Sequence, residues 1–176
     1  GVIEPIQTPS ALIAEIRDVD GNVLYRATPE PVDVATETTA HLTADILRNV
    51  VQHGTGRRAH GTVTAHGVDI PVGGKTGTTN DFKNAAFLGF VPATGEGGFV
   101  VEGAWAVGVY VGYDDNRPMS NGRIRLAGAS GALPAWIVAA GGAADVAARD
   151  AEKGAQLNLG PDLVRLPAEP QTGLVA

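Results

Sequence analysis

Hydrophobic and polar residues alternate with two different periods along this chain, and the change of period marks the expected elements. Residues 11–18 alternate with a period of two, which predicts a β-strand. Asp20-Gly21 is a typical turn of a β-hairpin, so residues 23–26 are predicted to return as a second strand. Residues 28–34 contain two prolines and are predicted to form a linker.

The period lengthens after the linker, where a helix is predicted to begin at Thr38 or Thr39, because either side chain can cap it. Gly54 is predicted to end this helix, since glycine is common just after the last turn. One apolar face is expected, formed by Leu42, Ile46, Leu47, Val50 and Val51. Three arginines near its end are interpreted as solvated surface cations: Arg48, Arg57 and Arg58.

Three strands are predicted in the middle of the chain, at residues 69–79, 87–91 and 99–113. The turns between them are short, which implies that the strands are antiparallel neighbours. Residues 92–95 are expected to end the second strand. Asp114-Asp115-Asn116 is interpreted as a turn and not as a carboxylate pair, because adjacent strand residues point to opposite faces.

The last third of the chain is rich in alanine and glycine. Ser130 can cap a helix that runs to about residue 140 and is interrupted at Gly141-Gly142, and residues 143–153 can form a further helix. Prolines and glycines beyond this point predict a poorly ordered tail over residues 154–176, which leaves 1–153 as one domain. The expected fold class is α+β, with an antiparallel sheet of three or more strands packed against flanking helices.

The composition removes several classes of function. The chain has 176 residues, 44% of them hydrophobic and 18% charged, as is typical of a globular protein. The net charge of −6 argues against nucleic acid as a partner. Cysteine is absent, and His53, His60 and His66 lack the spacing of a metal site, so they are interpreted as loop residues and neither a metal nor another cofactor is expected.

The sequence shows neither a membrane-spanning segment nor an N-terminal leader. No apolar run approaches the ~20 residues needed to span a bilayer, so no membrane segment is expected in this chain. No charged and then apolar leader opens it, and its first residue is Gly1 and not Met. We therefore expect a processed chain, an excised piece or an incomplete sequence.

The stretch from Lys75 to Thr78 carries the most chemistry. In an extended strand the hydroxyls of Thr76 and Thr78 point to one face, while Lys75 and Gly77 take the other, where the glycine leaves room for a close approach. One cation, two hydroxyls and the N–H groups of a strand edge suit a carboxylate or an oxyanion. A phosphate-binding loop is disfavoured, because its motif needs glycine where the chain has Asp69. An ordinary edge strand with a solvated lysine stays open on spacing alone.

Four stretches share their residues and their order with one enzyme family. Residues 75–81, K-T-G-T-T-N-D, reproduce its strand motif, and residues 47–59 match its helix and G-T-G-x-x-A segment. Residues 112–119 match its late strand end, and 131–136 the A-x-P-x-W start of its final helix. Together they resemble the transpeptidase domain of class A penicillin-binding proteins, which also carry a glycosyltransferase domain. The match covers residues 40–140, and the resemblance implies the later half of a serine β-lactamase/transpeptidase-like fold.

The resemblance implies peptidoglycan D,D-transpeptidation, in which a serine is acylated by the D-Ala-D-Ala end of a stem peptide. β-Lactams acylate the same serine. It assigns Lys75 and Thr78 to catalysis, and Thr76, Gly77 and Thr78 to substrate binding. Lys75 would supply charge and help move the proton, the two threonine hydroxyls would bind the terminal carboxylate, and the Thr78 N–H would serve an oxyanion hole. Ala86 departs from the family, whose members commonly carry a large aromatic there. The implied location is the periplasmic face of the bacterial inner membrane, with an N-terminal anchor that this sequence lacks.

The nucleophile is missing from this pattern, because the family needs lysine three positions after the serine. The three serines of the chain are followed at that spacing by other residues: Ser10 by Ile13, Ser120 by Arg123 and Ser130 by Leu133. The S-x-N motif is absent too. The chain is therefore interpreted as the C-terminal part of a transpeptidase domain whose serine-bearing part lies elsewhere, and it is predicted not to form an acyl-enzyme.

Two alternatives and one physical consequence follow. The chain could be a non-catalytic module that binds carboxylates or peptidoglycan, or an unrelated α+β domain. If a serine-bearing part normally packs against this chain, its absence is expected to expose an apolar patch, so a partner chain or self-association is expected as well.

Overall fold

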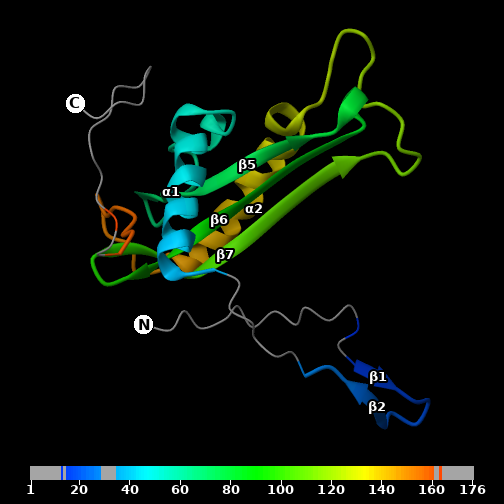
Figure 1. Ribbon diagram of the computed structural model, residues 1–176, viewed down its shortest axis with the longest axis horizontal. Coiled ribbons are helices and arrows are strands. Elements are labelled where there is room, and N and C mark those ends of the chain that lie inside the picture. Colours follow the sequence, from blue (N-terminus) through cyan, green and yellow to red (C-terminus); the bar gives the residue numbers. More distant parts are fainter. Residues whose placement is uncertain (1–12, 14, 29–34, 161–162, 164–176) are drawn as a thin grey trace. The chain divides into compact units, whose positions relative to one another are not determined.

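The computed structural model describes residues 13, 15–28, 35–160 and 163 (Figure 1). The chain divides into two compact units, Gly1–Glu37 and Thr38–Ala176, and each is described by itself. Within the described ranges, no helix is long and apolar enough to cross a membrane.

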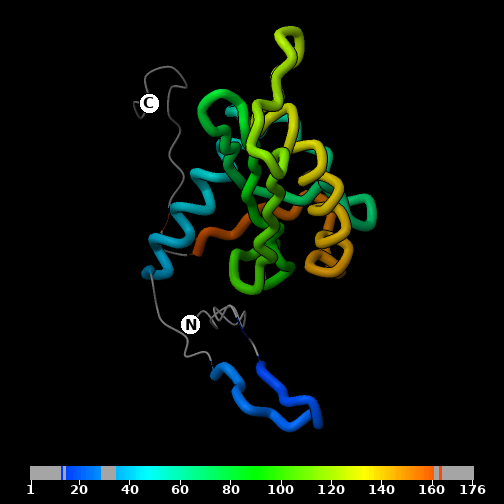
Figure 2. The backbone as a smooth tube through the Cα atoms, turned by 90° about the vertical axis from the view of Figure 1, so that its right-hand side faces the viewer, coloured from blue at the N-terminus to red at the C-terminus, as the bar shows by residue number. Residues whose placement is uncertain are grey.

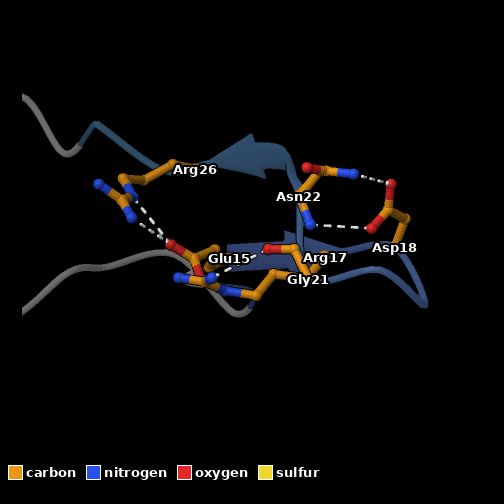
Figure 3. Close-up of polar contacts among 6 residues, drawn as sticks. All are labelled: Glu15, Arg17, Asp18, Gly21, Asn22 and Arg26. Carbon is orange, nitrogen blue, oxygen red and sulfur yellow. Dashed lines mark hydrogen bonds and ion pairs between the residues drawn. The ribbon is translucent and has the colours of Figure 1, made fainter.

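The first unit contains a hairpin of two antiparallel strands, β1 (Glu15–Arg17) and β2 (Val23–Arg26). Asp18 closes the turn, because its carboxylate accepts hydrogen bonds from the backbone N–H and the side-chain amide of Asn22, both at 2.8 Å (Figure 3). Gly21 has a φ of 87°, in the left-handed region that favours glycine. The predicted hairpin is thus confirmed.

Charge pairing surrounds Glu15 on this hairpin. Its carboxylate accepts hydrogen bonds from Arg17 and Arg26, the latter from Nε at 2.9 Å (Figure 3). These bonds, the one from Arg17 first, hold the pKa of Glu15 below its usual value. Hydrogen bonds from Asn22 lower the pKa of Asp18 in the same way. The remainder of the predicted first strand (residues 11, 12 and 14) and most of the predicted linker (residues 29–34) lie outside the described residues.

Helix α1 (Glu37–His53) begins one or two residues before the predicted caps and ends before Gly54, as predicted. Its predicted apolar face is correct only in part: Val51 is buried and Leu47 and Val50 are half-buried, whereas Leu42 and Ile46 are 50% and 56% exposed. The side chains that it buries are those of Ala44, Arg48 and Val51. The reason is a close approach of backbones: a Cβ at Gly73 would lie 2.9 Å from the backbone nitrogen of Arg48, so bulky apolar residues do not fit between helix and sheet here.

The interpretation of Arg48 as a solvated surface cation is wrong. Its residue is only 8% exposed, and its Nη2 and Nε atoms lie 3.0 and 3.2 Å from Oδ1 of Asp45, one helical turn earlier. A buried guanidinium needs such a partner, because an unpaired charge in the interior is costly. Arg57 and Arg58, by contrast, are exposed as predicted.

The predicted strand 69–79 is two strands and not one. β3 (Thr64–Ala65) and β4 (Val68–Asp69) form a short hairpin, and β5 (Gly73–Thr78) follows separately. The break lies at Pro71, where the N–H of Val72 donates to the carbonyl of Ile70 at 2.8 Å. This is a three-residue turn, and the fixed φ of proline suits its centre.

The main sheet has the strand order β5-β6-β7 and is antiparallel throughout, as predicted. β6 (Asn84–Gly95) is longer than predicted at both ends, because it begins three residues earlier and continues through Pro92. The register shifts between Val91 and Ala93, and this bulge accommodates a proline that has no N–H to give to the ladder. β7 (Gly98–Gly112) lies close to its predicted bounds, and the predicted turn after it is present, with the N–H of Asn116 donating to the carbonyl of Tyr113 at 2.9 Å.

Helix α2 (Leu133–Ala147) follows a single π-helical turn, η3 (Gly128–Ala132). The predicted break at Gly141-Gly142 is wrong, because the helix runs straight through both glycines, and no second helix extends to Lys153. Ser130 does not cap α2; its hydroxyl accepts a hydrogen bond from the N–H of Ala127 at 3.0 Å, which caps the preceding turn η3 instead.

Burial explains why the glycines do not end α2. Trp136 is fully buried, with its ring centroid 4.7 Å from that of Phe87 on β6 and its Nε1 donating to the Val107 carbonyl at 2.9 Å. Gly89 permits this contact, since a Cβ there would lie 2.7 Å from the indole ring. Helices α1 and α2 lie on opposite faces of the sheet (Figure 2), and α1 approaches its face at Gly73, the start of β5. The α+β class with an antiparallel sheet and flanking helices is therefore confirmed.

The chain after α2 stays packed further than the sequence suggested. Leu157 pairs with Phe99 in an isolated parallel bridge, and Leu157 and Leu159 are 3% and 8% exposed. Packing thus continues beyond the expected boundary at 153, through these two leucines. The division into a domain and a tail stays a prediction.

Candidate functional site

The motif strand β5 lies at the margin of the main sheet (Figure 1). Its partner is β6, with Lys75 opposite Leu88, Thr76 opposite Phe87 and Thr78 opposite Ala85. In the described part of the chain nothing pairs with its other edge. β5 is therefore an edge strand whose outward backbone groups can meet a ligand.

The direction of the backbone groups follows from the strand's alternation. The N–H of Thr79 donates to the carbonyl of Asn84 at 3.0 Å, so residue 79 points toward β6. Because successive residues of a strand point to opposite sides, the N–H groups of Thr76 and Thr78 point to the open edge.

The two threonines share a face, as predicted. The backbone N–H of Gly128, the first residue of η3, donates to Oγ1 of Thr78 at 2.9 Å. A Cβ at Gly128 would lie 2.9 Å from Cβ of Thr76, so Gly128 lies over both side chains. Oγ1 of Thr76 lies 2.8 Å from Oγ1 of Thr55, which follows α1.

Lys75 starts from the opposite face and returns to the open edge. Its Nζ lies 3.0 Å from the carbonyl oxygen of Thr76 and 3.3 Å from the Oγ1 atom of the same residue. No carboxylate of the described residues forms an ion pair with Lys75. The ammonium and the Thr76 hydroxyl thus meet at the edge toward which the Thr78 N–H points, and these groups suit an anion.

The sheet face that carries Lys75 is uncovered beside it. Leu88 lies opposite Lys75 and is 64% exposed, and Tyr110, opposite Ala86, is 69% exposed. We call this surface, made of Ala86, Leu88, Gly108 and Tyr110, the open sheet face. Two large exposed side chains lie on it, and the apolar patch expected from the sequence stays a prediction.

Gly77 does not play the packing role predicted for it within this chain. A Cβ at Gly77 would approach the Cβ of Ala86 to 3.5 Å, an ordinary contact. The close approaches of β5 occur instead at Gly73 and Gly74, where a Cβ would lie 2.4 and 2.5 Å from aromatic carbons. Gly77 faces the open sheet face, which explains the free space around it.

A tight turn closes the end of β5. Oγ1 of Thr79 accepts a hydrogen bond from the N–H of Asn84 at 2.9 Å. Asp81 and Phe82 have φ values of 59° and 54°, in the left-handed region that non-glycine residues rarely adopt. Residues 79–84 thus form the turn that leads from β5 into β6.

The other candidate groups lie away from this edge or carry no matching partner. Ser120 and Ser130, the serines within the described ranges, make no hydrogen bond to a lysine or a histidine. His53, His60 and His66 are exposed, and no group of three metal-ligating side chains occurs in the described residues. A cavity of about 400 Å³ opens between α1, β4 and residues 153–156, and neither Lys75 nor the threonines of β5 line it.

Sequence reasoning did not find Thr55 and Gly128 as partners of the motif. They lie 21 and 50 residues from the threonines that they contact. Thr55 belongs to the G-T-G segment already noted for its resemblance, which is the one available signal. Nothing in the local sequence marks Gly128.

Comparisons with known proteins show which family the chain is similar to. The family model described as penicillin binding protein transpeptidase domain matches residues 7–103. Penicillin-binding protein 1A of Aquifex aeolicus is 38% identical over 125 residues, which are 71% of this chain and 14% of that protein. Penicillin-binding protein 1B of Vibrio cholerae is 32% identical over 127 residues, 72% of this chain and 14% of that protein. The chain thus spans about 14% of the length of these relatives.

A solved structure is similar over most of the chain. The crystal structure of penicillin-binding protein 1A from Haemophilus influenzae superposes with a TM-score of 0.59 and 26% identity. The alignment covers 93% of this chain and 27% of that one. The arrangement of sheet and helices is therefore that of part of a larger domain.

Proposed function

This chain belongs to the family of penicillin-binding protein transpeptidase domains, in its class A branch, and from that premise we propose that it is part of a peptidoglycan D,D-transpeptidase. In that reaction a serine hydroxyl attacks the carbonyl between the two D-alanines of a stem peptide. The terminal D-alanine leaves with a proton, an acyl-serine ester remains, and the amine of a second peptide then takes over the acyl group. β-Lactams would form a stable ester with the same serine.

The observation that supports this proposal is the set of donors at the open edge of β5. The Thr78 N–H points outward, and the Lys75 ammonium turns back to the Thr76 hydroxyl. A peptide that ends in a carboxylate has its negative charge and its scissile carbonyl one residue apart, so it needs donors at two neighbouring points of a strand. This edge offers them.

Each predicted residue receives a role on that basis. Thr76 and Thr78 bind the terminal carboxylate through their hydroxyls, and Gly77 leaves space for the substrate on the face of Lys75. The N–H of Thr78 is one donor of the oxyanion hole, where losing a donor typically lowers the rate by about 10²–10³. Lys75 supplies positive charge and helps to move the serine proton.

The nucleophile comes, in this proposal, from a serine-bearing part of the same domain that this sequence does not include. That part would cover the open sheet face, because Leu88 and Tyr110 expose apolar surface beside Lys75. The 176-residue chain alone would then be inactive. The relatives are penicillin-binding proteins 1A and 1B, and the corresponding location for the complete protein is the periplasmic face of the inner membrane, with an anchor outside this chain.

A second candidate is a non-catalytic module that binds peptidoglycan carboxylates. The chain offers the donors of β5 without an S-x-x-K serine, and this favours binding without turnover. The reading frame that contains this sequence distinguishes the transpeptidase from the non-catalytic module. If S-x-x-K and S-x-N motifs are encoded upstream of residue 1, the protein is an enzyme, and if they are absent, it is a binding module.

The experiment that tests the site is a titration of the ¹⁵N-labelled chain with N-acetyl-D-alanyl-D-alanine, followed through its amide NMR signals. The C-terminal amide of the same dipeptide is the matched control, since it lacks only the charge. Hydrogen bonds to charged groups contribute about 1.5–3 kcal/mol, so the acid is expected to bind about tenfold or more tightly than the amide. Thr78→Val should remove most of that preference. Equal binding of acid and amide by the unaltered chain would contradict the proposed site.

A further inference from the structure

Thr55 lies outside the motif strand, yet its hydroxyl is in contact with it. Oγ1 of Thr55 and Oγ1 of Thr76 are 2.8 Å apart, a hydrogen bond in which either oxygen can be the donor. We propose that Thr55 is a positioning residue: it donates to Thr76 and thereby directs the Thr76 hydroxyl proton toward an incoming carboxylate. This inference rests on the proposed carboxylate site of β5.

The segment that holds Thr55 is rigidly placed. The N–H groups of Gly54 and Gly56 both donate to the carbonyl of Val50, at 3.0 and 3.1 Å, and the N–H of Arg57 donates to Gly54. A Cβ at Gly54 would lie 3.0 Å from the Val50 oxygen, and one at Gly56 would lie 3.2 Å from a side-chain carbon of Val51. The glycines on both sides of Thr55 let the chain fold tightly against the last turn of α1, and this turn presents the hydroxyl to β5.

The direction of this hydrogen bond determines whether the proton of Thr76 remains available to a ligand. A threonine hydroxyl has one proton and two lone pairs. The Lys75 ammonium can only donate, and it lies 3.3 Å from Oγ1 of Thr76, so it occupies one lone pair. If Thr55 accepted from Thr76, the single proton of Thr76 would be used within the protein. If Thr55 donates instead, both lone pairs are filled and the proton of Thr76 is free for an anion.

The hydroxyl of Thr78 also accepts a hydrogen bond from another element of the chain. The N–H of Gly128 can only donate, and it occupies a lone pair of Thr78 at 2.9 Å. The Thr78 proton is thereby left for an acceptor outside the chain. Two donors from different elements, Thr55 after α1 and Gly128 in η3, therefore set both hydroxyls of the strand as donors before any ligand binds. Such preorganisation favours binding because less order must be created on association.

The test uses the same titration, with Thr55→Val, which keeps the shape and removes the hydroxyl, and Thr55→Ser, which keeps the hydroxyl. The measured quantity is the ratio of affinities for N-acetyl-D-alanyl-D-alanine and its C-terminal amide. Thr55→Val is expected to lower this ratio about three- to tenfold, as for the loss of one hydrogen bond, and Thr55→Ser should stay within about twofold of the unaltered chain. A role in stability alone would weaken both ligands or neither, and would leave the ratio unchanged.

Two further variants control the experiment. In Thr62→Val, a hydroxyl that donates to backbone carbonyls in the same segment is lost without contact to β5, and the ratio should not change. Thr55→Ala gives the same test as valine without adding a methyl group, should the valine variant fail to fold. A normal ratio in both Thr55→Val and Thr55→Ala, or an equal loss in Thr55→Ser, would overturn the role of Thr55 alone. An unaltered chain that binds acid and amide equally would overturn the proposed carboxylate site and this inference with it.

Discussion

Replacing Gly128 by alanine is expected to destabilise the protein by about 2–4 kcal/mol. The new Cβ would lie 2.7 Å from the Gly77 carbonyl oxygen, 2.8 Å from that of Ala86 and 2.9 Å from the Thr76 Cβ, and none of these atoms is at the end of a flexible side chain. Overpacking of this kind costs about 1–3 kcal/mol. The shift of η3 that relieves it would also break the bond to Thr78, for about 1 kcal/mol more.

The matched control is the same substitution at Gly141, in the middle of α2. A Cβ there would meet nothing within 4 Å, and Gly141 has no positive φ. Alanine is a better helix former than glycine by about 0.5–1 kcal/mol, so Gly141→Ala should stabilise the protein by that amount. The control also tests whether α2 is continuous through its two glycines.

The assay is urea unfolding followed by tryptophan fluorescence, because Trp136 is fully buried and reports on the contact between α2 and the sheet. With a denaturant dependence of about 2 kcal/mol/M, the midpoint of Gly128→Ala should fall by about 1–2 M, while that of Gly141→Ala should rise slightly. A midpoint of Gly128→Ala at or above that of the unaltered chain would refute the account of how η3 lies on β5.

Two further predictions concern charges. The folded-state pKa of Glu15 is lowered, so its hydrogen bonds stabilise the hairpin fully above the ordinary pKa of 4.5 and are lost as the pH falls through the folded pKa. An NMR titration of the Glu15 carboxyl should therefore give a midpoint below 4.5. A midpoint above 4.5 would contradict the pairing with the arginines. Asp45→Ala removes the carboxylate from the buried Arg48 guanidinium and should lower the free energy of unfolding by about 2 kcal/mol. Arg48→Met removes the charge itself and should lower it by less than about 1 kcal/mol. Urea midpoints in the opposite order would contradict a desolvated ion pair.

The sequence predicted well what depends on local period and on short turns. The hairpin at Asp20-Gly21 and the long strand β7 were recognisable, because alternation and turn chemistry are local signals. The strand β6 was predicted too short, since Pro92 normally ends a strand and only the bulge beside it makes it acceptable.

Tertiary packing decided what local rules could not. Gly141-Gly142 predicted a break in α2, yet burial of Trp136 outweighs a penalty of about 1 kcal/mol for each glycine. Arg48 looked like a surface cation, because the sequence does not reveal that α1 turns this face to the sheet. These errors have one cause, since each depends on a contact between elements.

In the candidate site, too, local features were predictable and contacts between elements were not. The common face of Thr76 and Thr78 follows from the period of a strand, and the structure agrees. That Lys75 turns back to the edge, and that Thr55 and Gly128 hold the two hydroxyls, depends on contacts between separate elements. The roles of these residues in binding and catalysis stay predictions until a ligand is measured.

The central claim is that this chain supplies the anion-binding strand of a penicillin-binding transpeptidase without its nucleophile, and intact mass spectrometry with penicillin tests it most directly. The 176-residue chain should keep its mass of 18.0 kDa after incubation. A longer natural product that contains this sequence should gain the mass of one penicillin. A covalent adduct on the 18.0 kDa chain, or no adduct on the longer product, would contradict the account.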